Sequence, residues 1–139
     1  MLKKMNKKGF TLAELLIVVA IIGVLVAISI PIFTTQLEKS REAVDLANIR
    51  AAYAECTADV LTDSKNGYYK KVNPKQTKAG WVVDVSDVAG KDLSSVKPVS
   101  GTPIFVQVTK DGEFSVVTSK PVTGFIDADT VGNSTDDNG

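Results

Sequence analysis

The chain has 139 residues, which is within the usual range of a single domain, and a formal net charge of +0. It contains no histidine and one cysteine, Cys56, which excludes an internal disulfide, a Cys–His nucleophile and a histidine-ligated zinc site. We therefore expect no enzymatic activity, no cofactor and no metal. Residues 10–139 hold 12 basic and 16 acidic groups, and this acidic balance argues against a specific nucleic-acid partner.

Residues 1–9 form a basic leader, and residues 10–36 form an apolar helix that is long enough to cross a bilayer once. Glu14 is the one charged residue between the leader and Glu38. A carboxylate is unfavourable in lipid unless it lies near the interface or has a partner, so Glu14 points to a function. The leader's charge comes from four lysines, which predict a cytoplasmic N-terminal side and an exported remainder: Lys3, Lys4, Lys7 and Lys8.

The helix is predicted to continue to about residue 62, first apolar and then amphipathic. Gly23 and Pro31 interrupt the apolar half. Proline removes one helical hydrogen bond and clashes with the preceding turn, so we expect a kink or a looser stretch between these two residues.

The amphipathic half carries two apolar stripes when its residues are placed at 100° intervals. A bulky stripe suits packing against a sheet or loop in the same domain. A second stripe of mostly small residues either faces a neighbouring molecule or merely widens one core face with good helix formers. The bulky stripe is Leu46, Ile49, Tyr53, Cys56 and Val60; the small-residue stripe is Val44, Ala47, Ala51, Ala54, Ala58 and Leu61.

Beyond the helix, residues 68–80 are polar and lysine-rich and are predicted to be a loop. Residues 81–85 have the composition of a short strand, and residues 103–119 alternate like a hairpin with its turn at Asp111-Gly112. The prediction is an α+β fold in which the long helix packs on a small antiparallel sheet of three strands. The head spans residues 37–123 and includes the amphipathic half of the helix, and residues 124–139 are an acidic, flexible tail.

Residues 3–37 resemble one family specifically, the type IV prepilins and the related pseudopilins of secretion and competence systems. Lys8-Gly9 is followed by Phe-Thr-Leu-Ala-Glu-Leu-Leu from Phe10, and then by an unbroken apolar helix with a proline at Pro31. The resemblance implies the pilin-like fold, cleavage between Gly9 and Phe10 by a prepilin peptidase, and N-methylation of Phe10. It also implies that Glu14 contacts the Phe10 amine of a neighbouring subunit.

The chemistry of these residues gives a reason for each implied role. A glycine at the scissile bond lets an extended backbone enter a protease cleft, and the lysines hold that bond at the cytoplasmic face. Cleavage exposes a cationic amine at Phe10, four residues before the anionic Glu14. Neither charge is stable in lipid, and pairing across subunits relieves both and can set the register between packed helices.

The expected function is therefore a structural subunit of a type IV pilus for adhesion, motility or DNA uptake. The expected partners are other copies of the chain, a prepilin peptidase and methyltransferase, and the assembly platform with its ATPase. The chain would lie in the cytoplasmic membrane before assembly and in a surface pilus afterwards. A pseudopilin of a type II secretion or competence system is the alternative, and a secreted or membrane-anchored domain is a remote one.

Two further patterns invite other functions. Asp127-Ala-Asp129-Thr-Val-Gly132 partly matches the start of a calcium loop, but Val131 stands where an oxygen ligand is needed. The lysines of residues 70–78 could bind an anionic surface, although a solvated loop is the simpler interpretation.

Overall fold

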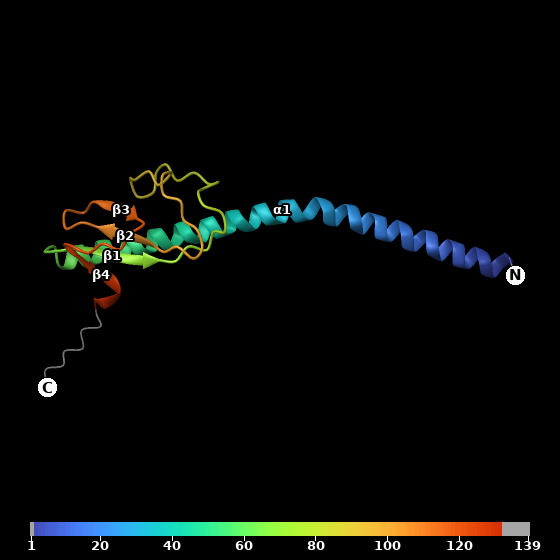
Figure 1. Ribbon diagram of the computed structural model, residues 1–139, viewed down its shortest axis with the longest axis horizontal. Helices are drawn as coiled ribbons and strands as arrows, with labels where there is room; N and C mark the ends of the chain where they lie inside the picture. Colours follow the sequence, from blue (N-terminus) through green and yellow to red (C-terminus); the bar gives the residue numbers. More distant parts are fainter. Residues whose placement is uncertain (1, 132–139) are drawn as a thin grey trace, which may run out of the picture. The chain divides into compact units, whose positions relative to one another are not determined.

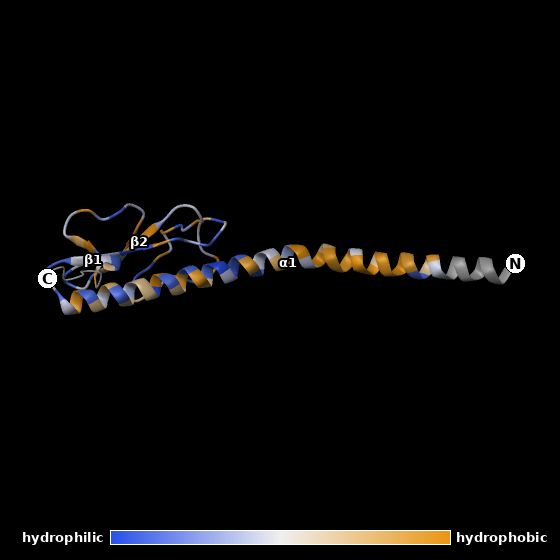
Figure 2. Cartoon of the chain, turned by 90° about the horizontal axis from the view of Figure 1, so that it is seen from below, coloured by the Kyte–Doolittle hydropathy of each residue, from blue (hydrophilic) through white to orange (hydrophobic). Residues whose placement is uncertain are grey.

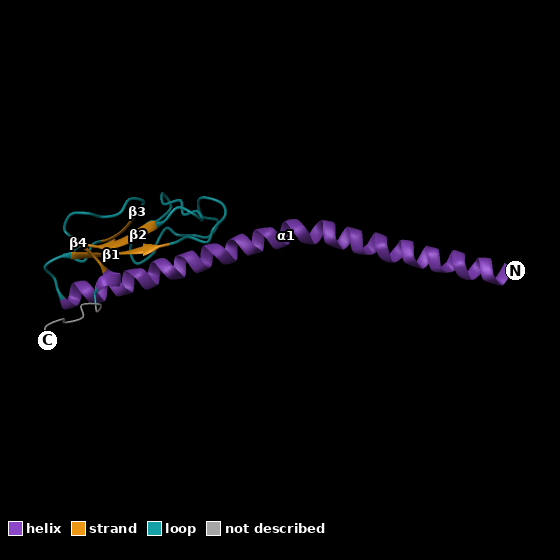
Figure 3. Cartoon of the chain, turned by 60° about the horizontal axis from the view of Figure 1, so that its bottom comes forward, coloured by secondary structure: helices purple, strands orange, loops and turns teal. Residues whose placement is uncertain are grey.

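The computed structural model describes residues 2–131, with side chains from residue 11 onward. Its elements are helix α1 (Leu2–Thr62), strands β1 (Gly67–Val72), β2 (Ile104–Val108), β3 (Phe114–Val117) and β4 (Phe125–Asp127), and a short 3-10 helix η1 (Ala128–Thr130) (Figures 1 and 3). The chain divides into two units at Leu37–Glu38, so α1 contributes its first part to one unit and its second part to the other. This confirms the predicted α+β fold with a long N-terminal helix.

The second unit contains a four-stranded sheet with the order β3-β2-β1-β4. The β2–β3 hairpin is antiparallel and pairs Val108 with Phe114, as the alternation around Asp111-Gly112 predicted. β1 pairs antiparallel with β2 and parallel with β4, so the sheet has one strand more than expected. Gly67 begins β1 where a Cβ atom would lie 2.7 Å from the Phe125 ring, so only glycine allows β4 to approach this closely.

Figure 1 shows the sheet alongside the C-terminal part of α1, and the core lies between them. From the predicted bulky stripe, Ile49, Cys56 and Val60 are buried, and Leu46 and Tyr53 are half-buried against the core, which confirms that stripe. Two clusters make up this core. One gathers around Ile49 and Val106, and the other gathers around Cys56 and Tyr68.

Three local predictions are wrong. Residues 68–72 of the expected loop belong to strand β1, because Lys70 and Lys71 lie between buried Tyr69 and Val72. The expected strand at residues 81–85 is absent, because the backbone N–H groups of Val82 and Val83 bond to the Glu42 carboxylate and not to a strand.

The expected flexible tail also differs from the structure in its first part. Residues 125–130 form β4 and η1, and β4 pairs with β1 through Gly67 and Phe125. Lys70 on β1 forms an ion pair with Asp129 at 3.2 Å, which attaches η1 to the sheet. The rest of the predicted tail, residues 132–139, lies outside the described residues.

Candidate functional site

The residues of the predicted cleavage site lie at the beginning of α1. Gly9, Phe10 and the four leader lysines belong to this helix, but their side chains lie outside the described residues. Glu14 follows one turn after Phe10 on α1, and its side chain is exposed. A separation of four residues places positions 10 and 14 on the same face of a helix.

The part of α1 that follows Glu14 is apolar on all sides, as its continuous hydrophobic colouring shows in Figure 2. α1 contains one segment that is long and apolar enough to cross a membrane, and no part of that segment is buried. Leu16 and Phe33, for example, are 69% and 66% exposed. Large apolar side chains that are exposed all round a helix need lipid or other protein to cover them.

The helix is continuous through both residues at which a kink was predicted. Pro31 lacks the N–H group that would bond to the carbonyl of Ala27, yet α1 runs on in helical conformation to Thr62. Just beyond it, the hydroxyls of Thr34 and Thr35 donate to the Pro31 carbonyl at 3.0 and 2.9 Å. Open space surrounds Gly23 in this structure. A kink at Gly23 or Pro31 stays a prediction.

The small-residue stripe of α1 is exposed along its whole length in the second unit. Val44 is 46% exposed and Leu61 is 82% exposed, and the alanines between them are exposed as well. Within the described residues no core covers this face of α1, whereas the face that carries the bulky stripe is buried under the sheet. The two stripes therefore differ in environment, which excludes the single broad core face.

Three acidic residues of α1 hold the loop that follows β1. The Glu38 carboxylate accepts the backbone N–H groups of Thr77 and Lys78 at 2.9 and 3.0 Å. Asp45 accepts those of Lys75 and Gln76 at 2.7 and 3.0 Å. Glu42 accepts those of Val82 and Val83 at 2.9 and 3.1 Å. We call Glu38, Glu42 and Asp45 the carboxylate clamp; all three are buried.

Hydrogen bonding favours the ionised form of the first member of the clamp. The Thr77 hydroxyl, the Lys78 N–H group and Arg41 together lower the pKa of Glu38 from 4.5 to about 2, although burial opposes this shift. Elsewhere in the head, a hydrogen bond with Glu55 raises the pKa of Lys70. Lys70 thus joins α1 to η1, since it pairs with both Glu55 and Asp129.

The remaining candidates for chemistry have structural contacts. Burial raises the pKa of the Cys56 thiol to about 12, so the thiolate that would act as a nucleophile is disfavoured. Asp127, in the sequence that resembles a calcium loop, caps η1 by accepting the Asp129 N–H group at 3.0 Å. No group of three or more potential metal ligands lies together among residues 11–131.

The carboxylate clamp is the feature that sequence reasoning missed, since none of its three residues belongs to either predicted stripe of the helix. A signal was nevertheless present. Positions 38, 42 and 45 continue the alternating spacing of four and three that leads to the buried residues Ile49, Ala52 and Cys56. Acidic residues in the register of a core stripe therefore indicate buried acceptors for backbone N–H groups.

Comparison with known proteins adds to this geometry. The prokaryotic N-terminal methylation motif matches residues 4–30. The fimbrial protein EcpC of Eikenella corrodens is 34% identical over 127 residues, which are 81% of this chain and 82% of EcpC. The type IV major pilin PilE1 of Neisseria gonorrhoeae is 31% identical over 84% of this chain and 51% of its own length. The narrow-pilus major component PilA5 of Thermus thermophilus is 50% identical over 38% of this chain and 48% of PilA5.

The extent of these matches differs along the chain. PilE1 and PilA5 are matched over about half of their own lengths, whereas EcpC is matched over most of its length. No solved structure matches the chain significantly. The methylation motif covers residues 4–9 of the predicted leader, the predicted cleavage site, Glu14 and most of the exposed apolar segment.

Proposed function

This chain belongs to the type IV pilins, and we propose that it is a structural subunit of a type IV pilus, assembled through the apolar part of α1. The observation that supports this proposal most directly is the exposed apolar segment, most of which lies within a methylation motif. Lipid can cover that segment before assembly, and the same segments of other copies can cover it in a filament. A subunit with this role needs no catalytic activity of its own.

The proposed route begins with processing. A prepilin peptidase cuts between Gly9 and Phe10, and the new amine of Phe10 is methylated. The residues support this route because the leader lysines favour a cytoplasmic position for the scissile bond, next to an apolar segment. An assembly platform with its ATPase would then extract the subunit into a pilus on the cell surface.

Glu14 is proposed to set the register between packed subunits. After cleavage, its carboxylate lies four residues beyond a cationic amine in an otherwise apolar segment. A neighbouring helix that is shifted along its axis pairs the two charges, and any other register leaves a charge unpaired at a cost of about 3–5 kcal/mol. The names of the relatives favour a pilus subunit over a pseudopilin, since they are major pilins and a fimbrial protein.

Two measurements test the proposal. The protein recovered from its native cells should have an intact mass and an N-terminal sequence that begin at methylated Phe10. Glu14→Gln keeps the side-chain shape but removes the charge, so it should still be cleaved and inserted into the membrane but should be missing from sheared filaments.

Ser29→Ala is the matched control, because the one hydrogen bond of the Ser29 hydroxyl among residues 11–131 goes to the Leu25 carbonyl of its own helix, at 2.6 Å. That variant should assemble normally. Normal filaments from Glu14→Gln would refute the register role, and an uncut native chain would refute the processing and assembly route.

A further inference from the structure

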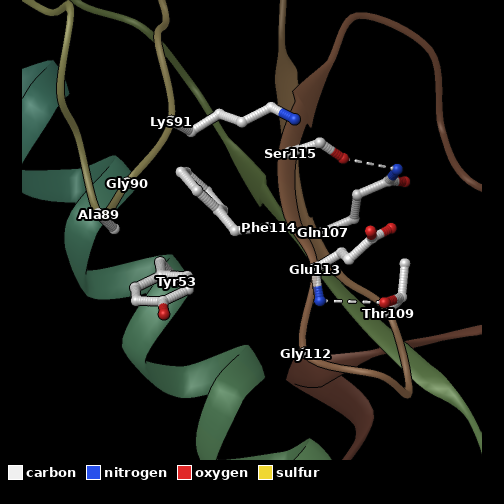
Figure 4. A pocket seen from close by; sticks show the side chains of 10 residues that line it. All are labelled: Tyr53, Ala89, Gly90, Lys91, Gln107, Thr109, Gly112, Glu113, Phe114 and Ser115. Atoms are coloured by element: carbon white, nitrogen blue, oxygen red, sulfur yellow. Dashed lines mark hydrogen bonds between the residues drawn. The ribbon is translucent and has the colours of Figure 1, made fainter.

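A polar cavity of about 420 Å³ lies in the head, away from the apolar segment of α1. Its walls come from three separate places, as Figure 4 shows: Tyr53 on α1, the turn before Lys91, and the β2–β3 hairpin. This volume is within the range of small-molecule sites in proteins. All of these walls belong to the second unit of the chain.

Tight turns fix both walls that carry charged side chains. Ala89 and Gly90 have φ angles of +54° and +79°, and Val88 and Lys91 exchange backbone hydrogen bonds of 2.8 and 3.1 Å across them. Ala89 is the one residue other than glycine with a positive φ among the described residues. Such a backbone conformation costs alanine about 1 kcal/mol and occurs most often at functional sites.

On the opposite wall, the hairpin turn is closed by two hydrogen bonds between Thr109 and Glu113. The Thr109 N–H group donates to the Glu113 carbonyl at 2.9 Å, and the Glu113 N–H group donates to the Thr109 hydroxyl at 3.1 Å. The Glu113 side chain is therefore attached to a fixed backbone at the edge of the cavity (Figure 4).

Two opposite charges face this cavity without meeting each other. Figure 4 shows the Lys91 side chain extending across the cavity toward Ser115, with the Glu113 carboxylate on the hairpin side. Among residues 11–131, neither charged group belongs to an ion pair. Lys91 and Glu113 are both exposed, so water solvates their charges when the cavity is empty. An anion alone would be repelled by Glu113 and a cation alone by Lys91, whereas a molecule with both charges would be attracted by both side chains.

The uncharged residues that line the cavity include two hydrogen-bonding side chains and two aromatic rings. The Gln107 amide donates to the Ser115 hydroxyl at 2.9 Å, so the Ser115 hydrogen is available to donate and Gln107 Oε1 is available to accept. On the α1 side of the hairpin, the rings of Tyr53 and Phe114 pack at 4.8 Å between centroids (Figure 4). Aromatic rings also attract ammonium groups.

We propose that this cavity binds a small zwitterion, with its anionic group at Lys91 and its ammonium group at Glu113. The two groups come from different elements of the head, Lys91 from the turn at residues 88–91 and Glu113 from the β2–β3 hairpin. The source of the molecule is either a free solute or the headgroup of a zwitterionic lipid on a surface that the protein meets. None of the residues that line the cavity belongs to the apolar segment through which assembly is proposed.

The test is a titration of the full chain in a nonionic detergent with phosphoethanolamine, followed by ligand-observed NMR. We expect saturable binding with a dissociation constant of about 1 mM or lower. Lys91→Gln and Glu113→Gln should each weaken binding by about tenfold, since each removes one charge contact. Lys110→Gln and Asp111→Asn are the matched controls, because each removes a charge of the same sign from a hairpin residue that does not line the cavity, and they should bind normally.

Unchanged Trp81 fluorescence confirms that each variant keeps its fold, since Trp81 packs against the core of the head. Sedimentation with phosphatidylethanolamine vesicles distinguishes the source of the ligand. If the chain binds the vesicles and Lys91→Gln abolishes this binding, the ligand is a lipid headgroup. If the chain binds phosphoethanolamine but not the vesicles, the ligand is a free solute. Either result supports the site. The absence of saturable phosphoethanolamine binding up to about 10 mM would overturn the proposal. It would also be overturned if the chain bound inorganic phosphate as well as phosphoethanolamine and if Glu113→Gln bound phosphate more tightly.

Discussion

Removing one charge from the carboxylate clamp should destabilise the head strongly. Asp45 is fully buried on α1, and each of its carboxylate oxygens accepts one backbone N–H group, from Lys75 at 2.7 Å and from Gln76 at 3.0 Å. The substitution Asp45→Asn keeps the shape of the side chain. It retains one acceptor oxygen, but it places an NH₂ group against the second N–H group, which then has no partner.

The expected cost follows from those two hydrogen bonds. A hydrogen bond to a charged group contributes about 1.5–3 kcal/mol, and a buried donor without a partner costs about 1–3 kcal/mol. One bond is lost and the other becomes neutral, so the free energy of unfolding should fall by about 3 kcal/mol. That loss is a large fraction of the 5–15 kcal/mol typical of a small domain, and it corresponds to a melting temperature about 15 °C lower.

Urea unfolding of the full chain in a nonionic detergent can measure this change. Trp81 is the only tryptophan, and its indole N–H group donates to the Val96 carbonyl at 2.8 Å, so its fluorescence reports on the clamped loop. Asp59→Asn is the matched control on the same helix, since no hydrogen bond of the Asp59 side chain occurs within the described structure. Burial raises the pKa of Asp59, so its ionised form does not stabilise the fold and its neutralisation should not lower the free energy of unfolding.

A fall of less than about 1 kcal/mol for Asp45→Asn would refute this reasoning, because it would mean that the loop N–H groups find other acceptors at little cost. An equal fall for both variants would also refute it. In that case the cause would be the loss of a helix charge and not the loss of the clamp.

Three further predictions concern the head. The pKa of Glu38 is lowered from 4.5 to about 2 in the folded state, so its contribution is complete above about pH 4.5 and disappears as the pH falls toward 2. Acid titration of wild type and Glu38→Gln should give stabilities that converge over this window. Cys56, whose pKa is raised to about 12, should resist iodoacetamide at pH 8 in the folded chain and react rapidly in urea. Ala89→Asn should raise the free energy of unfolding by about 1 kcal/mol, since Asn-Gly suits a turn with two positive φ angles. The control Ala47→Asn, on the exposed face of α1, should not raise it. Unchanged thermal unfolding of Ala89→Asn would contradict this prediction.

Elements with a strong periodic signal were predictable from the sequence. The end of α1 near residue 62 follows from the turn-forming residues after it, and the β2–β3 hairpin follows from alternation around Asp111-Gly112. The bulky stripe of α1 was predictable for the same reason. The turn-forming residues mark the helix end, and the local spacing of apolar residues determines which face of the hairpin and of the helix is buried.

β1 was not predictable, because its sequence conceals its burial. In Tyr-Tyr-Lys-Lys-Val, Lys70 is half-buried and its charge is paired with Glu55, 15 residues earlier, and with Asp129, 59 residues later. No local pattern reveals such partners. The same applies to β4, which is only three residues long and exists because it pairs with β1.

The segment Trp81–Val85 packs most of its apolar residues against the core although it is not a strand. Val85 is buried, and Trp81 and Val83 pack against the core, as apolar residues should. Their backbone lacks a neighbouring strand, and a buried N–H group without an acceptor is rare in native proteins. Glu42 supplies the acceptor in place of a strand.

The carboxylate clamp therefore explains how a head with a small sheet can bury a long loop. Six backbone N–H groups between residues 75 and 83 bond to carboxylates of α1, and each would otherwise need a strand or water. Apolar residues at positions 38, 42 and 45 would extend the core stripe of the helix, but they would leave those six groups unsatisfied. The acidic residues in this register thus fix the loop to α1, and the loop in turn carries Lys91 to the wall of the polar cavity.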